Sequence, residues 1–415
     1  MSTVLPSERD LAAESLRLGS SLRCRTPAET LAIATPLMAA LGISRVTDVT
    51  RLDRLGLPVF ASIRPRGLAL CVNAGKGMTA LEARVGARME AVEFAAAEPG
   101  RSDWQRRTLR FDELVETWAG EFGLLRLAPR IGPAPRPDRQ VDVLQCEDVA
   151  GGRPLWLPAE LIFVPFADPH GPPLCGWSTN GLASGNSIDE ATLHAMLEIL
   201  ERDAIAMNRP RDASLWLEPG ELPEPLRTLA ADWRRGGVAL SVRLVPNDFD
   251  LPCFHAVLHE GEGAVVGLAE GSGLHLDPAI ALARAVCEAA QARLSHIHGG
   301  RDDITLFYAT HGEGKRGAVP AHETLAWREA FDTRCRIAWR DLPAAPARGQ
   351  SLAALLAGLV ERLRARGFRQ VLRHRFALEL GGMHVVKVVI PGCEPCEHGL
   401  RRMGERLFAR IDGRG

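Results

Sequence analysis

The chain of 415 residues lacks the features that mark several specialised classes of protein. Its formal net charge is −1, so it has no basic excess of the kind that binds nucleic acid or an anionic membrane surface. It contains no uninterrupted apolar run long enough to cross a bilayer, and its start, MSTVLPSERD, lacks the basic and apolar regions of a signal peptide. We therefore expect a globular protein with neither a nucleic-acid nor a membrane partner.

The sequence also lacks the cysteine pattern of a disulfide framework. Its cysteines are odd in number and mostly dispersed, at positions 24, 71, 146, 175, 253, 287, 335, 393 and 396. Such a set is typical of reduced thiols and indicates a cytoplasmic protein. Cys393 and Cys396 form a single C-x-x-C with His398 nearby, which is half a zinc site. Ordinary reduced thiols are favoured there over a redox or sulfur-relay role.

Common nucleotide-binding and hydrolase motifs are missing as well. The stretch GKG at 75–77 has no Walker A frame around it, and Ala80 breaks any G-x-G-x-x-G. It is either a glycine turn that offers backbone N–H groups to a phosphate or simply a tight turn. No nucleophile elbow or Ser-His-Asp order is present.

Strand-like and helical segments alternate along the chain, and we predict an α+β fold. The segment 98–140 ends in the proline-rich, basic APRIGPAPRPDR and is interpreted as an insertion or surface excursion. The expected strands are 58–63, 68–73, 141–149, 161–166, 238–246, 253–260, 264–271 and 384–392, and the expected helices are 27–41, 80–97, 187–204 and 277–298.

Three of these helices share one pattern, A-x3-A-x2-E-x2-[E/Q], at Ala83, Ala191 and Ala281. Each is preceded by a glycine-bearing turn and by a helix-capping residue four positions before its first alanine. The capping residues are Thr79, Ser187 and Asp277. The agreement of turn, cap and register predicts three equivalent strand–turn–helix units, in which the alanines allow close packing.

The repeat places acidic side chains on equivalent helix faces. At roughly 100° per residue, Glu190, Glu198 and Glu201 lie within about 80° of one another, beside a separate apolar stripe. If the units surround one centre, the side chains of Glu90, Glu93, Glu198, Glu201, Glu288 and Gln291 converge there. Crowded carboxylates need cations, and hard oxygen ligands favour Mg²⁺, which usually arrives with phosphates.

Simpler interpretations exist for individual acids. An isolated E-x-x-E pair is usually a solvated helix face. A glutamate at the third helical position often closes a capping box, which would explain Glu82 fully and Glu190 in part. Their occurrence in a common repeat favours the metal interpretation.

The chain resembles the YcaO family over roughly residues 22–395. The resemblance rests on GISRVTDVTRLDRLGLPVF, GKGMTALEARVGARMEAVE, STNGLASGNSIDEATLHAMLEILERDA, EAAQARL with RDDI, and HVVKVVIPG, which occur in the family's order. It implies an enzyme that uses ATP and Mg²⁺ to phosphorylate a peptide backbone amide oxygen, after which a nucleophile attacks the carbon and phosphate leaves.

The resemblance also implies roles for individual residues. The family's metal ligands correspond to Glu90, Glu93, Glu198 and Glu201. Its nucleotide contacts correspond to Arg23, Thr30, Asn186, Glu190, Arg202, Gln291 and Arg293. One departure is Gly86, where the family often has a serine, so one hydroxyl contact to the nucleotide is missing. No general base is identified.

Features outside these motifs indicate to which branch of the family the chain is similar. The chain has no proline-rich PxPxP tail and resembles stand-alone members that act with a TfuA-like partner in peptide thioamidation. The expected partners are a precursor peptide and a TfuA-like protein, with a homodimer also considered. The expected organisation is a lead-in at 1–21, a YcaO domain at 22–400 and a tail at 401–415. The alternatives are an azoline-forming cyclodehydratase and a non-catalytic nucleotide- or metal-binding scaffold.

Overall fold

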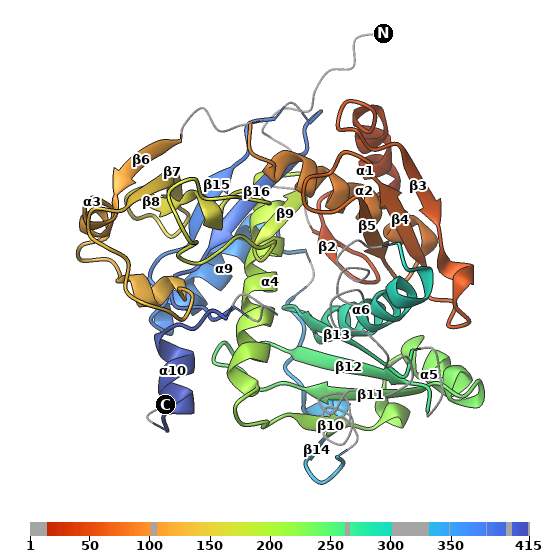
Figure 1. Ribbon diagram of the computed structural model, residues 1–415. Coiled ribbons are helices and arrows are strands. Elements are labelled where there is room, and N and C mark those ends of the chain that lie inside the picture. The colour runs from red at the N-terminus through yellow and green to blue at the C-terminus, as the bar shows by residue number, and fades with distance from the viewer. Residues whose placement is uncertain are drawn as a thin grey trace, which may run out of the picture.

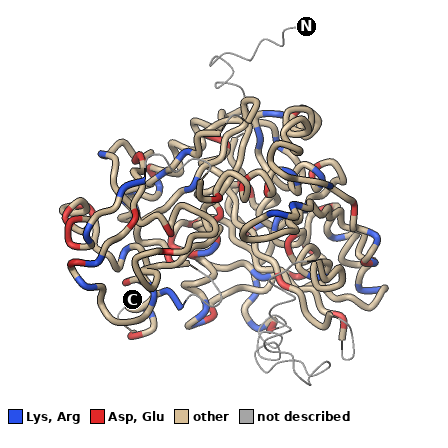
Figure 2. The backbone as a smooth tube through the Cα atoms, turned by 45° about the horizontal axis from the view of Figure 1, so that its top comes forward, with Lys and Arg blue, Asp and Glu red and all other residues tan. Residues whose placement is uncertain are grey.

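The structure is a computed structural model that describes residues 15–100, 106–261, 266–300, 332–347, 349–378, 380–395 and 401–413. Its helices and strands form three larger, mainly antiparallel sheets and one two-stranded sheet, with helices packed between and around the larger sheets, as Figure 1 shows. The α+β prediction is confirmed. Within the described residues, no helix is both long and apolar enough to span a membrane. Basic and acidic positions intermix along the described chain (Figure 2).

The first sheet has the order β3 (Arg45–Asp48), β4 (Val59–Ile63) and β5 (Val72–Lys76). The second has the order β6 (Arg107–Arg110), β7 (Gln140–Asp148), β15 (Leu372–Arg375), β16 (His384–Val389) and β9 (Leu182–Gly185), with β8 (Leu155–Pro158) also paired to β7. The third has the order β13 (Leu268–Leu274), β12 (Cys253–His259), β11 (Ala239–Leu244), β10 (Leu215–Leu217) and β14 (Arg336–Ile337).

The described α-helices are α1 (Pro27–Ala34), α2 (Ala80–Ala97), α3 (Phe111–Thr117), α4 (Ile188–Asn208), α5 (Leu226–Arg235), α6 (Pro278–His298), α9 (Leu352–Ala365) and α10 (Glu405–Ile411). A short hairpin, β1 (Leu16–Arg17) with β2 (Leu22–Arg23), precedes them. The segment interpreted as an insertion contributes β6 and α3, so part of it belongs to the edge of the six-stranded sheet.

The three predicted repeat units are β5–α2, β9–α4 and β13–α6. Thr79, Ser187 and Asp277 are their N-caps, and each side chain accepts a hydrogen bond from the first turn of its helix. Each repeat strand lies at the edge of a different sheet. In Figure 1, α4 runs through the middle of the molecule, between the six-stranded and five-stranded sheets.

The units close into a ring, because each helix packs on its own strand and also on the strand of the next unit. Helix α2 packs on β9, α4 packs on β13, and α6 packs on β5. The repeat alanines on the packed faces of the three helices are fully buried, as predicted. Glycines on the strands permit this approach: a Cβ added to Gly75 or Gly271 would collide with the backbone of the following helix.

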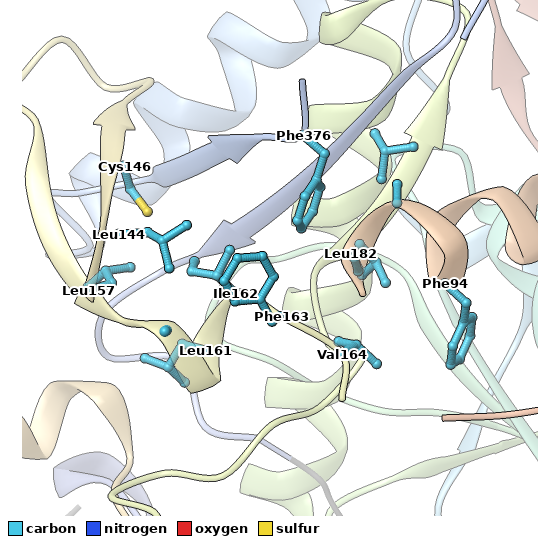
Figure 3. Packing of buried hydrophobic residues seen from close by; sticks show 14 of the residues in the cluster. Phe94, Leu144, Cys146, Leu157, Leu161, Ile162, Phe163, Val164, Leu182 and Phe376 are labelled. Atoms are coloured by element: carbon cyan, nitrogen blue, oxygen red, sulfur yellow. The ribbon is translucent and has the colours of Figure 1, made fainter. Parts of the chain in front are cut away.

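Three predicted strands differ in the structure. The strand expected at 264–271 corresponds to β13, which runs on to Leu274. The strand expected at 68–73 begins only at Val72 and extends to Lys76, so Gly75 and Lys76 belong to a strand and not to a turn. The apolar run at 161–166 contains no strand. It forms a buried connection in which Ile162, Phe163 and Val164 fill the core beneath the six-stranded sheet (Figure 3). A short apolar run indicates burial but does not distinguish a strand from a buried loop.

Candidate functional site

A large cavity of about 870 Å³ lies where the three repeat units meet. Its volume falls within the range of about 300 to 1,000 Å³ that is usual for small-molecule sites. Ten of the eleven residues assigned through the resemblance line it, namely Arg23, Thr30, Glu90, Glu93, Asn186, Glu190, Glu198, Glu201, Arg202 and Gln291. The ring of units therefore brings together residues that are distant in the sequence.

Helix α2 supplies Glu90 and Glu93 to this cavity. One oxygen of Glu93 accepts hydrogen bonds from the backbone nitrogen of Ser184 at 2.8 Å and from its hydroxyl at 2.6 Å. Burial raises the pKa of the Glu93 carboxyl to about 8 despite these two donors, and the charges of Glu90 and Glu198 raise it further. Glu93 thus joins α2 to the next unit and lies where added positive charge would be favourable.

Helix α4 supplies Glu198 and Glu201 to the same cavity. Glu201 is 2% exposed and accepts hydrogen bonds from the Ser272 hydroxyl at 2.6 Å and from the Leu274 backbone nitrogen at 3.0 Å, both on β13. Burial raises the pKa of Glu198, although the charge of Arg202 opposes the shift. Glu201 is therefore fixed to the next strand, and Glu198 is a carboxyl whose ionisation is disfavoured by its surroundings.

Helix α6 carries Gln291 where the other two units carry the second glutamate. Its side-chain nitrogen donates to the carbonyl oxygen of Ala74 on β5 at 3.2 Å. The corresponding strands offer N–H and hydroxyl donors to Glu93 and Glu201, whereas β5 offers an acceptor, so an amide suits this position. The Gln291 side-chain oxygen is buried without a hydrogen-bond partner, and this acceptor is available to a donor in the cavity.

A second polar network lies at the N-terminal end of α4. The Glu190 carboxylate accepts from the Asn186 backbone and side-chain nitrogens, each at 3.1 Å, and from the guanidinium of Arg23 at 3.3 Å. The Thr30 hydroxyl donates to the Asn186 side-chain oxygen at 3.1 Å. Four residues assigned to the nucleotide by resemblance are thus connected in one chain of hydrogen bonds.

Glu82 and Glu190 do not close capping boxes. The Glu82 carboxylate accepts from the backbone nitrogen of Met78, one residue before the N-cap, and from the β1–β2 hairpin. The explanation of Glu82 by its own capping box is wrong, because a partner distant in the sequence reaches this carboxylate.

The cavity residues that were not identified from the sequence include Lys76, His194 and Arg284. His194 and Arg284 occupy the position of Gly86 in the other two repeats, so the repeat register could have indicated them. Burial, together with the charges of Arg284 and Arg23, lowers the pKa of His194 well below its usual value. The Nε of Arg284 is buried without a hydrogen-bond partner. The site therefore contains a neutral imidazole and a guanidinium donor beside the acids.

Lys76 favours the ionised form of Glu288, the acid of the third repeat unit. Its ammonium group lies 3.2 Å from the Glu288 carboxylate. Burial opposes ionisation of Glu288, but the charges of Lys76 and Arg202 hold its pKa below the usual value. Protein cations thus outweigh burial at Glu288, whereas burial outweighs the nearby cations at Glu198 and prevails at Glu93.

The donor set of the cavity fits Mg²⁺ with a phosphate ligand. Its lining has eight carboxyl groups and five Lys or Arg side chains, which would leave three negative charges in excess if every carboxyl group were ionised. Among the described residues, no three His, Cys, Asp or Glu side chains are already arranged to hold a metal. Mg²⁺ commonly takes only one or two carboxylates and completes its shell with phosphate oxygens and water. The excess charge and the raised pKa values of Glu93 and Glu198 therefore suit a metal that enters with a nucleotide.

One predicted site residue, Arg293, lies elsewhere, as does Cys393 of the C-x-x-C pair. Arg293 is 5% exposed and does not line the cavity. Its guanidinium contacts the Asp53 carboxylate at 3.0 Å, the Glu260 carboxylate at 2.5 Å and the Val266 carbonyl oxygen. The Cys393 thiol also lies outside this cavity, and burial raises its pKa well above the usual value. Cys396, His398 and the RDDI motif lie outside the described residues.

The pKa of Glu93 predicts a pH dependence of stability. The unfolded chain releases this proton near pH 4.5, whereas the native protein holds it until about pH 8. Native protein binds more protons in that window, so its stability falls as pH rises through it, by up to about 1.4 kcal/mol per pH unit. We expect the free energy of unfolding, measured by urea denaturation without divalent metal, to fall between pH 6 and pH 8. The fall should be roughly 1–2 kcal/mol larger in wild type than in Glu93→Gln. Equal losses would contradict the assignment.

Comparisons with known proteins identify the family. Residues 74–394 match the family model described as YcaO cyclodehydratase, ATP- and Mg²⁺-binding. A protein of Methanothermobacter thermautotrophicus is 30% identical over 93% of this chain and 98% of its own length. A Rhizobium leguminosarum bv. trifolii protein, described as lying in the tfuA 3′ region, is 29% identical over 90% of this chain and 88% of its own.

Solved structures show the same fold. The YcaO structure of Methanopyrus kandleri with AMPPCP and Mg²⁺ has a TM-score of 0.72 and 25% identity, covering 95% of this chain and 98% of that one. A heterocyclase in complex with substrate and cofactor has a TM-score of 0.74 at 21% identity, covering 96% of this chain and 56% of that one. The ring of three units, its carboxylate-rich cavity and the extent of the family match lead to one conclusion: the chain belongs to the YcaO family.

Proposed function

We propose that this protein uses ATP and Mg²⁺ to phosphorylate the oxygen of a peptide backbone amide, and that sulfide then replaces that oxygen to give a thioamide. The observation that carries the proposal is the ring of three helices, which gathers four glutamates and Gln291 on one cavity with an excess of negative charge. The family description, which names ATP and Mg²⁺ binding, supports the first part.

In this proposal Glu90, Glu93, Glu198 and Glu201 hold Mg²⁺, which supplies positive charge to the transferring phosphoryl group. Arg23, Thr30, Asn186, Glu190, Arg202 and Gln291 hold the nucleotide. The unpartnered Gln291 oxygen accepts a hydrogen bond from a nucleotide donor, and Arg202 offers charge to phosphate oxygens. Arg293 is left out because its guanidinium is engaged away from the cavity.

The remaining wall of the cavity suits a peptide. Leu70, Met89, Phe94 and Trp177 line it together with the acids, and Trp177 is 38% exposed. A neutral amide with apolar neighbours can lie against such a wall, which also limits the access of water to the phosphorylated amide. Phosphorylation makes the amide oxygen a good leaving group. Attack by hydrosulfide at the amide carbon then forms the C–S bond, and the oxygen departs in phosphate.

The thioamide branch is supported by two observations. One relative is described as lying in a tfuA 3′ region, and the motif wording around residues 42–60 resembles stand-alone members of the family. The partners in this proposal are a precursor peptide and a TfuA-like protein, in the cytoplasm. The alternative is cyclodehydration of Cys, Ser or Thr side chains. It is retained because the fold is also similar to that of a heterocyclase.

Mass spectrometry of a peptide treated with ATP, Mg²⁺, sulfide and the TfuA-like protein separates the outcomes. Exchange of oxygen for sulfur makes the peptide heavier, whereas azoline formation makes it lighter by one water. We expect the heavier product, with one ADP and one phosphate formed for each modification. Loss of water would favour the cyclodehydratase. ATP and peptide binding with no conversion would favour a scaffold.

A further inference from the structure

The β1–β2 hairpin contacts the N-terminal ends of all three repeat helices. At α2, the Glu82 carboxylate accepts from the Gly19 backbone nitrogen at 3.0 Å and from the Ser20 hydroxyl at 3.2 Å. These two residues form the turn of the hairpin, which is closed by a hydrogen bond from the Leu18 nitrogen to the Ser21 carbonyl oxygen. The tip of the hairpin is thus tied to the first unit.

The second strand of the hairpin is tied to α4, and the first strand is tied to α6. Glu190 accepts from the Cys24 backbone nitrogen at 2.8 Å and from the Arg23 guanidinium at 3.3 Å. Asp277, the N-cap of α6, accepts from Nε of Arg17 at 2.7 Å. One short hairpin therefore joins an acid from the first turn or cap of every unit in the ring.

The hairpin is held by these polar contacts and by the partly buried side chains of Leu22 and Cys24, which pack against the edge of the core. No residue from 15 to 29 is buried, and β1 and β2 share only two residue pairs. A two-stranded hairpin is marginal in water when it stands alone. A segment with few buried apolar contacts opens at low free-energy cost. The hairpin can therefore detach while the ring beneath it stays folded.

The hairpin is also a wall of the cavity. Leu18, Ser20, Ser21 and Arg23 line the same space as the acids of α2 and α4. A nucleotide in that space would contact the closed hairpin and would favour the closed state. We propose that the β1–β2 hairpin is a strap that opens to admit the nucleotide and closes on it, with Glu82 and Asp277 as positioning residues that place Arg23. This inference rests on the proposed nucleotide site.

Gly19 gives a direct way to obstruct closure. A Cβ at this position would lie 2.8 Å from the Met78 Cβ, and Met78 immediately precedes the N-cap of α2. Gly19 does not line the cavity, so a substitution there removes no side chain that is proposed to contact the nucleotide. Gly19→Val should hold the tip of the hairpin away from α2. Gly220→Val is the matched control, because a Cβ at Gly220 meets nothing within 4 Å.

The test is stopped-flow binding of a fluorescent ADP analogue with Mg²⁺ to the full chain. Gly19→Val should both bind and release the analogue faster, with release accelerated at least about tenfold, the change that corresponds to 1.4 kcal/mol. Arg17→Ala, which removes the tie to Asp277 outside the cavity, should act in the same direction with a smaller effect. Gly220→Val should behave as wild type, and the apo thermal midpoint of each variant should stay unchanged.

The outcomes separate the strap from the nucleotide site itself. Wild-type protein that does not bind the analogue would refute the proposed function. Binding by wild type with unchanged kinetics in both hairpin variants would refute the strap alone. Faster release with unchanged association would make the hairpin a fixed wall, and this would also overturn the gating inference. If Gly19→Val fails to fold, Arg17→Ala provides the same comparison.

Discussion

Glu198→Gln should reduce peptide-dependent ATP turnover by about 100-fold or more while leaving the fold intact. The loss follows from removing one of the carboxylates proposed to hold Mg²⁺, whose charge stabilises the transferring phosphoryl group by several kcal/mol. Glu198 is the best of the four acids for this test. Burial already raises its pKa, so an uncharged isostere relieves an unfavourable ionisation. Glu201 is less suitable because both of its oxygens hold β13.

The measurement is phosphate release at saturating peptide across a range of Mg²⁺ concentrations, with urea denaturation alongside. The apparent requirement for Mg²⁺ should rise in the variant. Glu361→Gln is the control, since the Glu361 side chain is 70% exposed on α9 and pairs with Arg364 one turn away. Wild-type turnover in Glu198→Gln would remove this glutamate from the metal site and would weaken the assignment of the other three.

Gly75→Ala should destabilise the protein by about 3 kcal/mol, at the upper end of the usual cost of overpacking. The added Cβ would overlap backbone atoms of Ala83 and Ala87 on α2, and a backbone cannot yield as a flexible side chain can. The packing of α6 should weaken as well, because α6 also packs on β5.

Gly86→Ala is the matched comparison for Gly75→Ala. Its Cβ would meet nothing closer than 3.5 Å, so this substitution in the interior of α2 should be neutral or should stabilise by up to about 1 kcal/mol. Urea denaturation of both variants would measure the difference. Equal effects would mean that the close approach of β5 to α2 does not limit stability.

Much of the ring could be predicted from the sequence, because its signals are local. Thr79, Ser187 and Asp277 mark helix starts through their own side chains, and the alanine spacing marks the packed faces. The register of the three helices then predicts which side chains share the cavity. The family resemblance added the nucleotide contacts, which spacing alone does not identify.

What could not be predicted depends on partners far apart in the chain. Glu82 has the spacing of a capping box, yet its carboxylate is taken by a hairpin more than sixty residues away. Lys76 belongs to a strand, and its contact with Glu288 spans 212 residues. Arg293 follows Gln291 by two positions and so lies on another side of α6, against Asp53.

The ring also has a consequence for synthesis of the chain. Strand β5 ends at Lys76, but the helix that completes its surroundings ends at His298. At about 5–20 residues per second, a ribosome needs roughly 10–45 s to make the intervening segment. During that time the nascent protein has an exposed sheet edge and an unfinished cavity. Chaperone binding to nascent chains should therefore be strongest before α6 emerges and should decline sharply afterwards.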